Sequence, residues 1–182
     1  GNAWNYTFYV PHDIYGLAKL MGGKERFISQ LQSVFDRGNY DPTNEPNIAY
    51  PYLFSYFKGE EWRTQVLTHK LLKAYFKNNP EGLPGNDDTG TMSAWAIFSM
   101  IGFYPDCPGE PAYTLTSPVF DKITLHLDPK QWGKDKLVIE TKRSNPNAVR
   151  IEKMEVDGKP WHNYRISHSD LVKAGVLKFT LK

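Results

Sequence analysis

The spacing of apolar residues in the first part of the chain is typical of helices. A clear case lies between Gly23 and Gly38, where apolar residues recur every three or four positions at Phe27, Leu31, Val34 and Phe35. The segment GEEWRTQVLTHKLLKAYFKNNPEG (59–82) has acids near its start and lysines toward its end, as the helix dipole favours, and an apolar stripe of Leu67, Leu71 and Tyr75. Both segments therefore predict amphipathic helices.

Two further segments predict helices with little polar surface. NIAYPYLFSYFKG (47–59) predicts a buried helix with Pro51 inside it or at its first turn. TGTMSAWAIFSMIGFYP (89–105) is apolar nearly all round, so we expect a helix that packs on several sides and ends at Gly102 or soon after. Short connections between these helices indicate an assembly of antiparallel neighbours.

After residue 105 apolar and polar residues alternate, which is the pattern of strands. Asp157-Gly158 suits the type I′ turn of a hairpin. We therefore predict a mixed α and β chain, with a helical segment over 1–104 and an antiparallel, sandwich-like β region over 105–182. The strand segments are YTLTSPVF (113–120), KITLHLD (122–128), KLVIETKRS (136–144), RIEKMEVDGKPW (150–161) and VLKFTLK (176–182).

Composition narrows the classes of function. The 182 residues suffice for one domain with a real core or for two small ones, and the net charge of +2 does not suggest nucleic acid as a partner. No run of about 18 apolar residues predicts a membrane span. The single cysteine, Cys107, allows no internal disulfide and is expected to be buried. Aromatic residues make up 14% of the chain, which permits carbohydrate binding without showing it.

The segment PGNDDTG (84–90) raises the first question of chemistry, because two acids stand side by side before an apolar helix. In one interpretation Asp88 caps that helix and Asp87 is solvated. In the other, a carboxylate at the mouth of the helix acts as a general base or a metal ligand. Adjacent acids repel each other and a cap needs only one, which argues against the capping interpretation that the local sequence alone favours.

Two other polar segments leave alternatives open. In DPTNEPNIAYPY (41–52), Asn44-Glu45-Pro46 is either an ordinary helix entry or a source of hard oxygen ligands for calcium, although its spacing matches no EF-hand. In GNAWNYTFYVPHDIYG (1–16), the aromatic residues predict core and Asp13 a helix cap; His12 has no partner nucleophile for a triad. The remaining histidines are expected to be structural or solvated: His69, His126, His162 and His168.

Taken together and in order, GNAWNYTFYVPHDIYGLAKLMGG, NEPNIAYPYLFSY, WRTQ and GNDDTGTMSAWAIFSMIGFYPDCPG are much more specific than any one alone. The chain resembles the C-terminal part of glycoside hydrolase family 92, the calcium-dependent exo-acting α-mannosidases, most strongly over residues 1–110. The resemblance implies an (α/α)₆-type helical toroid joined to a β-sandwich domain, and hydrolysis with inversion. It implies release of terminal mannose from α-linked mannosides or N-glycans, and a periplasmic or extracellular location in bacteria.

The resemblance also implies roles for individual residues. Asp88 takes the position of the catalytic base, and Asn86 stands where the family often has a carboxylate that helps to hold the water. Calcium is the implied cofactor. The implied metal-binding residues are Glu45 and Asn44, and the implied substrate-binding residues are Trp4, His12 and Asp87, of which Asp87 is the one more suited to a loop or orienting role.

The general acid of the family is a Glu immediately before the Gly-Asn-x-Trp motif, and this sequence begins at that Gly. We therefore expect a fragment of a larger enzyme that lacks activity alone and partners with a missing N-terminal part. The alternative is a non-catalytic carbohydrate-binding or structural module, which would not need the NDDTG and NEP motifs together. A third possibility is a toroid hydrolase of another sugar family. A requirement for calcium would distinguish the α-mannosidase from it.

Overall fold

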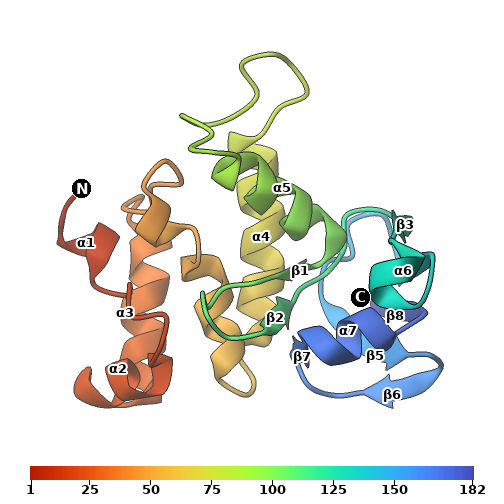
Figure 1. Cartoon of the computed structure of the whole chain (residues 1–182). Coiled ribbons are helices and arrows are strands. Elements are labelled where there is room, and N and C mark those ends of the chain that lie inside the picture. Colours follow the sequence, from red (N-terminus) through yellow and green to blue (C-terminus); the bar gives the residue numbers. More distant parts are fainter.

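The helices come first along the chain and the strands follow, in a computed structural model that describes residues 1–182 (Figure 1). The helices of residues 1–101 lie mainly on one side of the molecule, and most of the strands lie on the other. The helical part consists of α1 (Ala3–Tyr6), α2 (Ile14–Leu20), α3 (Lys24–Asp36), the 3₁₀ helices η1 (Glu45–Asn47) and η2 (Tyr50–Tyr56), α4 (Glu61–Tyr75) and α5 (Thr91–Ile101).

The three long helices match their predictions. The apolar residues of α3 point into the core, with Phe27, Leu31 and Val34 fully buried. Helix α5 ends where expected, because Gly102 adopts a left-handed conformation with φ of 104°. Helix α5 packs on several sides, as expected, and Ile97, at 54%, is its one exposed residue. The apolar periodicity therefore fixes where these helices lie and most of what they bury.

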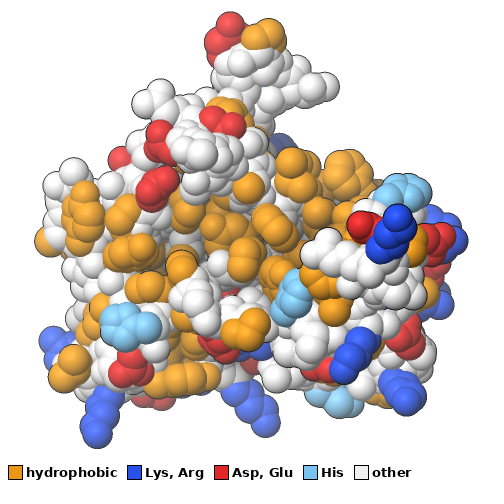
Figure 2. Space-filling view, in the orientation of Figure 1, with side chains coloured by type: hydrophobic (Ala, Val, Ile, Leu, Met, Phe, Trp, Pro, Cys, Tyr) orange, Lys and Arg blue, Asp and Glu red, His pale blue; other side chains and the backbone are white.

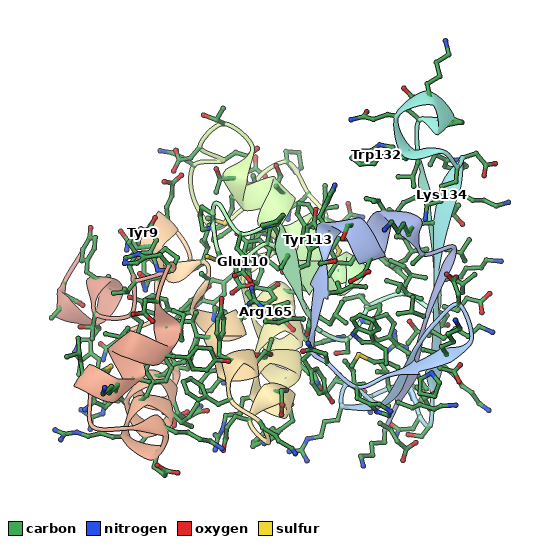
Figure 3. The ribbon with its side chains drawn as sticks, turned by 60° about the horizontal axis from the view of Figure 1, so that its bottom comes forward. Tyr9, Glu110, Tyr113, Trp132, Lys134 and Arg165 are labelled. Carbon is green, nitrogen blue, oxygen red and sulfur yellow. The ribbon has the colours of Figure 1, made fainter.

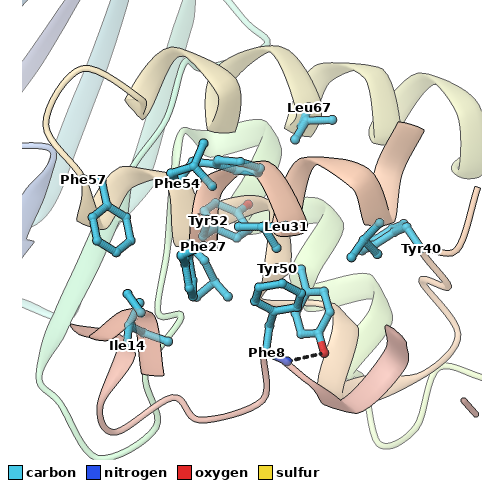
Figure 4. Packing of buried hydrophobic residues seen from close by; sticks show 14 of the residues in the cluster. Phe8, Ile14, Phe27, Leu31, Tyr40, Tyr50, Tyr52, Phe54, Phe57 and Leu67 are labelled. Atoms are coloured by element: carbon cyan, nitrogen blue, oxygen red, sulfur yellow. Dashed lines mark hydrogen bonds between the residues drawn. The ribbon is translucent and has the colours of Figure 1, made fainter. Parts of the chain in front are cut away.

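The buried helix predicted for segment 47–59 is present, with 3₁₀ rather than α geometry. It forms the 3₁₀ helix η2, with Pro51 in its first turn and the Tyr52 amide donating to the Ala49 carbonyl oxygen at 2.9 Å. Its side chains fill the centre of the helical core. Figure 4 shows Tyr50 among them, with its hydroxyl accepting a hydrogen bond from the Phe8 amide at 3.1 Å.

The strands form two sheets. The three-stranded sheet has the order β1-β2-β7 and the five-stranded sheet the order β3-β4-β8-β5-β6. Asp157 and Gly158 both have positive φ, at 49° and 76°, which confirms the predicted type I′ hairpin. The strands are β1 (Phe103–Tyr104), β2 (Ala112–Leu115), β3 (Lys122–His126), β4 (Lys136–Arg143), β5 (Ile151–Val156), β6 (Lys159–Trp161), β7 (Arg165–Ser167) and β8 (Val176–Leu181).

The expectation of purely antiparallel pairing is wrong. Strands β4 and β8 run parallel, in register from Val138 opposite Val176 to Arg143 opposite Leu181. The chain between them includes β5, β6, β7 and the helix α7 (His168–Lys173), and so provides the long crossover that a parallel pair needs. Alternation along one strand reveals its buried face but not its partner. The short helices α7 and α6 (Pro129–Trp132) were not predicted either.

The two parts of the molecule meet at β1, whose neighbouring residues belong to different cores. Phe103 packs in the cluster formed by the sheets, and Tyr104 packs in the helical cluster. Farther along, Gln65 of α4 accepts a hydrogen bond from the Ile151 amide of β5 at 2.8 Å. The sequence boundary at residue 104 thus falls inside this junction, and the division into domains 1–104 and 105–182 stays a prediction.

A buried acid forms the polar centre of the junction. The side chain of Asp106 is fully buried; it accepts hydrogen bonds from Tyr56 of η2 at 2.7 Å and Thr114 of β2 at 2.6 Å. Arg165 of β7 lies 3.3 Å from the same carboxylate and 2.7 Å from Glu110. Figure 3 shows Glu110 and Arg165 together where helices and sheets meet. Asp106 therefore connects three elements from both parts of the chain.

The surface is divided by residue type. Figure 2 shows hydrophobic side chains across the middle of one face, with acidic side chains above them and basic ones mainly along its lower and right-hand edges.

None of the helices combines the length and apolar character needed to cross a membrane. Cys107 is buried and unpaired, as expected.

Candidate active site

The three polar segments singled out in the sequence lie beside one another. A Cβ on Gly85 would come within 2.9 Å of Thr43 Cγ2, so the loop before α5 rests on the segment before η1. Trp95 of α5 donates from Nε1 to the Ile48 carbonyl oxygen at 2.8 Å. On the other side, the Tyr6 hydroxyl of α1 lies 3.4 Å from Asn44 Oδ1. The segment 43–48 is thus in contact with both of the others.

Side-chain amides connect α1 to this segment. Asn44 donates from Nδ2 to Asn47 Oδ1 at 2.8 Å, and the Asn5 carbonyl oxygen lies 3.5 Å from the same Nδ2. Asn5 Nδ2 in turn donates to the Asn39 carbonyl oxygen at 3.2 Å. Asn47 is fully buried, and its own Nδ2 has no hydrogen-bond acceptor. These contacts hold Asn44 with its Oδ1 facing Tyr6.

Glu45 begins η1, with Pro46 in the first turn, so the predicted helix entry is confirmed as a 3₁₀ turn. Its side chain is exposed, and no hydrogen bond or ion pair engages the carboxylate. The Glu45 charge nevertheless affects a core residue. The pKa of Tyr104 is raised above its ordinary value, chiefly by burial, next by the charge of Asp106 and then by that of Glu45. Glu45 thus offers a free anionic group beside the aromatic core.

The donors in this segment are of the type that fits calcium, which prefers carboxylate, amide and carbonyl oxygens. Glu45 supplies a free carboxylate and Asn44 an amide oxygen. The chain has no group of three or more His, Cys, Asp or Glu side chains that could hold a metal ion. Calcium takes about six to eight oxygens, so the two residues fit as part of a site that other oxygens must complete.

Asp87, and not Asp88, caps α5. Its Oδ1 accepts from the Ser93 amide at 2.7 Å and its Oδ2 from Ser93 Oγ at 2.9 Å. The amides of Met92 and Thr91 donate to the carbonyl oxygens of Asp87 and Asp88, at 3.1 and 3.2 Å. The first amides of the helix are therefore satisfied without the Asp88 side chain. The interpretation in which Asp88 caps and Asp87 is solvated is wrong.

Asp88 lies in a strained turn. Asp88, Thr89 and Gly90 all have positive φ, at 47°, 62° and 88°. For residues other than glycine this conformation costs about 1–3 kcal/mol each and is rarest for β-branched residues such as Thr. The Asp88 side chain is exposed and has no hydrogen bond or ion pair. Such strain clusters at functional sites, which favours a role for this carboxylate beyond the fold.

Trp4 and His12 are not brought to these acids. Trp4 packs against the helical core, with the Arg37 guanidinium 5.8 Å from its ring centre. It lines a cavity of about 440 Å³ between α1 and α3, to which segments 41–48 and 84–93 contribute nothing. His12 is exposed on the turn before α2, which Asp13 caps through the Gly16 amide at 2.8 Å, as predicted. Asn86 is exposed beside Asp87.

Two residues of this region escaped the sequence reasoning. Tyr6 was assigned to the core, yet it is 52% exposed and faces Asn44. Trp4 and Tyr6 are two residues apart in a short helix and so cannot lie on the same face. That spacing would have predicted that only one of them is buried. Ser93 was not considered, and no local signal marks it, because side-chain capping contacts normally span two to four residues and this one spans six.

Comparison with known proteins identifies relatives over the whole chain. The family profile described as the glycosyl hydrolase family 92 catalytic domain matches residues 1–182. An uncharacterized secreted glycosidase from Arthroderma benhamiae is 28% identical over 180 residues, which cover 98% of this chain and 23% of that protein.

Solved structures of the same kind superpose closely. The family GH92 α-mannosidase BT3965 from Bacteroides thetaiotaomicron matches with a TM-score of 0.91 and 30% identity, over 100% of this chain and 25% of that one. The family GH92 inverting mannosidase BT2199 of the same organism matches with a TM-score of 0.88 and 30% identity, over 100% of this chain and 27% of that one. The chain thus spans about a quarter of the length of these relatives.

Proposed function

Since the chain belongs to glycosyl hydrolase family 92, we propose that it forms part of an inverting, calcium-dependent α-mannosidase that releases terminal α-linked mannose from mannosides or N-glycans. The observation that carries the proposal is the free carboxylate of Asp88, held in a strained turn beside the segment that contains Glu45. The named activity of BT2199, an inverting mannosidase, supports the stereochemistry.

Asp88 is the proposed general base. In an inverting glycosidase one carboxylate takes a proton from water as the water attacks the anomeric carbon, while a separate acid about 6.5–9.5 Å away protonates the leaving oxygen. A base needs an accessible oxygen with no competing partner, and Asp88 has one because Asp87 caps the helix in its place. Asn86, two residues before, would orient the water through its amide without sharing the proton.

Glu45 and Asn44 are the proposed protein ligands of calcium, since both present hard oxygens on the same turn. When bound, calcium would coordinate sugar hydroxyls and favour a distorted ring. The contact between Gly85 and Thr43 would keep the base and this ligand turn together. Trp4 and His12 remain proposed substrate-binding residues, and Tyr6 joins them because it is exposed beside Asn44. Asp87, whose two carboxylate oxygens both accept hydrogen bonds from Ser93, is proposed in the orienting role instead.

The remainder of the site is proposed to lie outside these 182 residues. Neither Asp88 nor Glu45 lines any of the five main cavities of the chain, which supports a substrate pocket shared with further segments. We propose that these segments supply the general acid Glu and the rest of an (α/α)₆ toroid. The secreted relative supports an extracellular or periplasmic location.

The decisive experiment is Asp88→Asn in the full-length protein. We expect loss of turnover on an α-mannobioside with retained binding of the sugar, because the amide keeps the shape but cannot accept the proton. Glu81→Gln is the matched control, since Glu81 is an exposed acid of the same loop without partners. Unchanged turnover in Asp88→Asn would reject the base and favour a non-catalytic carbohydrate-binding or structural module.

Two simpler assays test the other parts of the proposal. EDTA should abolish turnover and added calcium restore it, whereas activity unaffected by EDTA would reject the metal. The 182-residue chain alone should show no hydrolysis under conditions in which the full-length protein is active. Hydrolysis at a comparable rate would show that the general acid lies within these residues.

A further inference from the structure

Asp87 and Ser93 bracket the turn that carries Asp88. The Asp87 carboxylate accepts from the Ser93 amide at 2.7 Å and from Ser93 Oγ at 2.9 Å. Ser93 Oγ also lies 3.2 Å from the Gly90 carbonyl oxygen, on the far side of the same turn. The Ser93 hydroxyl, with one proton to donate, thus lies between the residue before Asp88 and the end of the turn after it, closer to Asp87.

The second of these bonds goes beyond capping. A cap requires only that a side-chain oxygen accept from an amide of the first helical turn, and the Ser93 amide meets that need. The bond from Ser93 Oγ to the other carboxylate oxygen fixes the rotation of the Asp87 side chain as well. With both oxygens engaged, Asp87 has a defined orientation relative to α5.

The turn depends on such support. Asp88 and Thr89 adopt left-handed conformations that residues with a Cβ rarely take, and they do so in succession. The hydrogen bonds from Ser93 hold Asp87, the residue just before the turn. The Thr91 hydroxyl holds the turn itself, because it donates to the Asp88 carbonyl oxygen at 2.7 Å. Without these contacts the turn would relax, and the direction of the Asp88 side chain would change with it.

The helix that provides the support is itself fixed to the predicted metal-binding turn. Trp95 stacks on Phe76 with ring centres 5.4 Å apart, and its Nε1 donates to the Ile48 carbonyl oxygen. Contacts therefore run from Asp87 through Ser93 and α5 to the residues just after Glu45. The position of Asp88 relative to Glu45 is set along this route.

We propose that Asp87 and Ser93 are positioning residues, a hydrogen-bonded pair that fixes the direction of the Asp88 carboxylate. The inference rests on the proposed role of Asp88 as general base and assigns no proton transfer to the pair itself.

The test uses four variants of the full-length protein: Asp87→Ala, Ser93→Ala, the double variant and Ser93→Thr. Loss of positioning should lower kcat about 10- to 100-fold in Asp87→Ala while KM changes little, because a misaligned base affects the transition state more than substrate binding. The double variant should be no worse than Asp87→Ala, since the two residues act through one contact. Ser93→Thr keeps the hydroxyl and should retain activity. Glu81→Gln is again the control.

Hydrogen exchange gives a readout independent of turnover. The amides of residues 88–94 should exchange faster in Asp87→Ala and at the wild-type rate in Ser93→Thr, while thermal unfolding shows that both variants are folded. If Asp88→Asn is inactive but Asp87→Ala keeps its kcat within about twofold, or if the losses in the double variant add, the positioning role is wrong. If Asp88→Asn is fully active, the proposed base itself fails.

Discussion

At the scale of single residues, the two adjacent acids have separate tasks. Asp87 satisfies the start of α5, and Asp88 is left with a free carboxylate on a left-handed turn. The turn ends at Gly90, where φ is 88° and an added Cβ would meet nothing within 4 Å. A substitution at Gly90 therefore measures backbone strain alone.

We predict that Gly90→Ala lowers the free energy of unfolding by about 1–2 kcal/mol, because a left-handed backbone disfavours any Cβ. Gly90→Asn should cost less, since Asn tolerates this conformation better than Ala. Urea denaturation of both variants checks the order. Equal stability of Gly90→Ala and wild type would show that the turn is not left-handed in solution.

His69 provides a pH-dependent prediction. Burial lowers its pKa below 6.5, although a 2.9 Å hydrogen bond to the Ser117 carbonyl oxygen partly opposes this. Below pH 6.5 the unfolded histidine gains a proton that the folded one does not, so the unfolded state binds more protons. The contribution of neutral, buried His69 to the free energy of unfolding is therefore present above pH 6.5 and is lost as the pH falls below it.

Replacing His69 by Gln, which keeps a donor for Ser117, should make the free energy of unfolding less dependent on pH between about 5 and 7. The difference in slope cannot exceed about 1.4 kcal/mol per pH unit, the value for one proton. Denaturant titrations at several pH values measure it, with the exposed His162→Gln as control. Parallel curves for His69→Gln and wild type would contradict the prediction.

At the scale of elements, α5 is the piece that joins the two acidic segments, and Trp95 is its main attachment. Trp95→Phe retains most of the packing on Phe76 but removes the donor to the Ile48 carbonyl oxygen. We predict a loss of about 1–2 kcal/mol in the free energy of unfolding, the cost of a part-buried acceptor without a partner. Trp132→Phe is the matched control, because Trp132 Nε1 makes no hydrogen bond within the protein. Equal losses would show that the bond to Ile48 contributes nothing.

The elements also show what the sequence can predict. Helix α3 follows from the spacing of Phe27 and Leu31, and the β5–β6 hairpin from Asp157-Gly158, because these signals are local. The parallel pairing of β4 with β8 does not follow, since the partner of a strand is set by a crossover over many residues. The 3₁₀ form of η2 escaped prediction because a continuous apolar run such as Tyr50–Tyr56 has no period to read.

The candidate site shows the same limit. The motifs at 41–48 and 84–90 were predicted to share a site, and the contacts of Gly85 and Trp95 place them together. The capping interpretation named the wrong acid of the pair, because local sequence lets either Asp87 or Asp88 reach the helix. The choice depends on the rotation of the backbone at Asp88, which a hydrogen bond six residues away helps to set.

At the scale of the whole molecule, Asp106 links the helical part to both strands β2 and β7. Its fully buried carboxylate receives Tyr56, Thr114 and Arg165, whereas Glu110, the second acid on Arg165, is 48% exposed. Burial, followed by the charge of Asp106, raises the pKa of Tyr56, so this phenol stays protonated and can donate to Asp106 at neutral pH. The two acids on one arginine allow a matched comparison.

We predict that Asp106→Asn lowers the free energy of unfolding by about 3 kcal/mol, because it leaves a partly buried guanidinium without its buried counter-charge. Glu110→Gln should cost less than about 1 kcal/mol, as is usual for exposed ion pairs, and its loss should shrink with added salt. Denaturation followed by circular dichroism and by tryptophan fluorescence measures both. If this junction couples the unfolding of the helical and sheet parts, the circular dichroism and fluorescence transitions should coincide in wild type. In Asp106→Asn the two transitions should have different midpoints. Similar small losses in both variants would instead place the coupling in the apolar contacts around Phe98, which packs against both clusters.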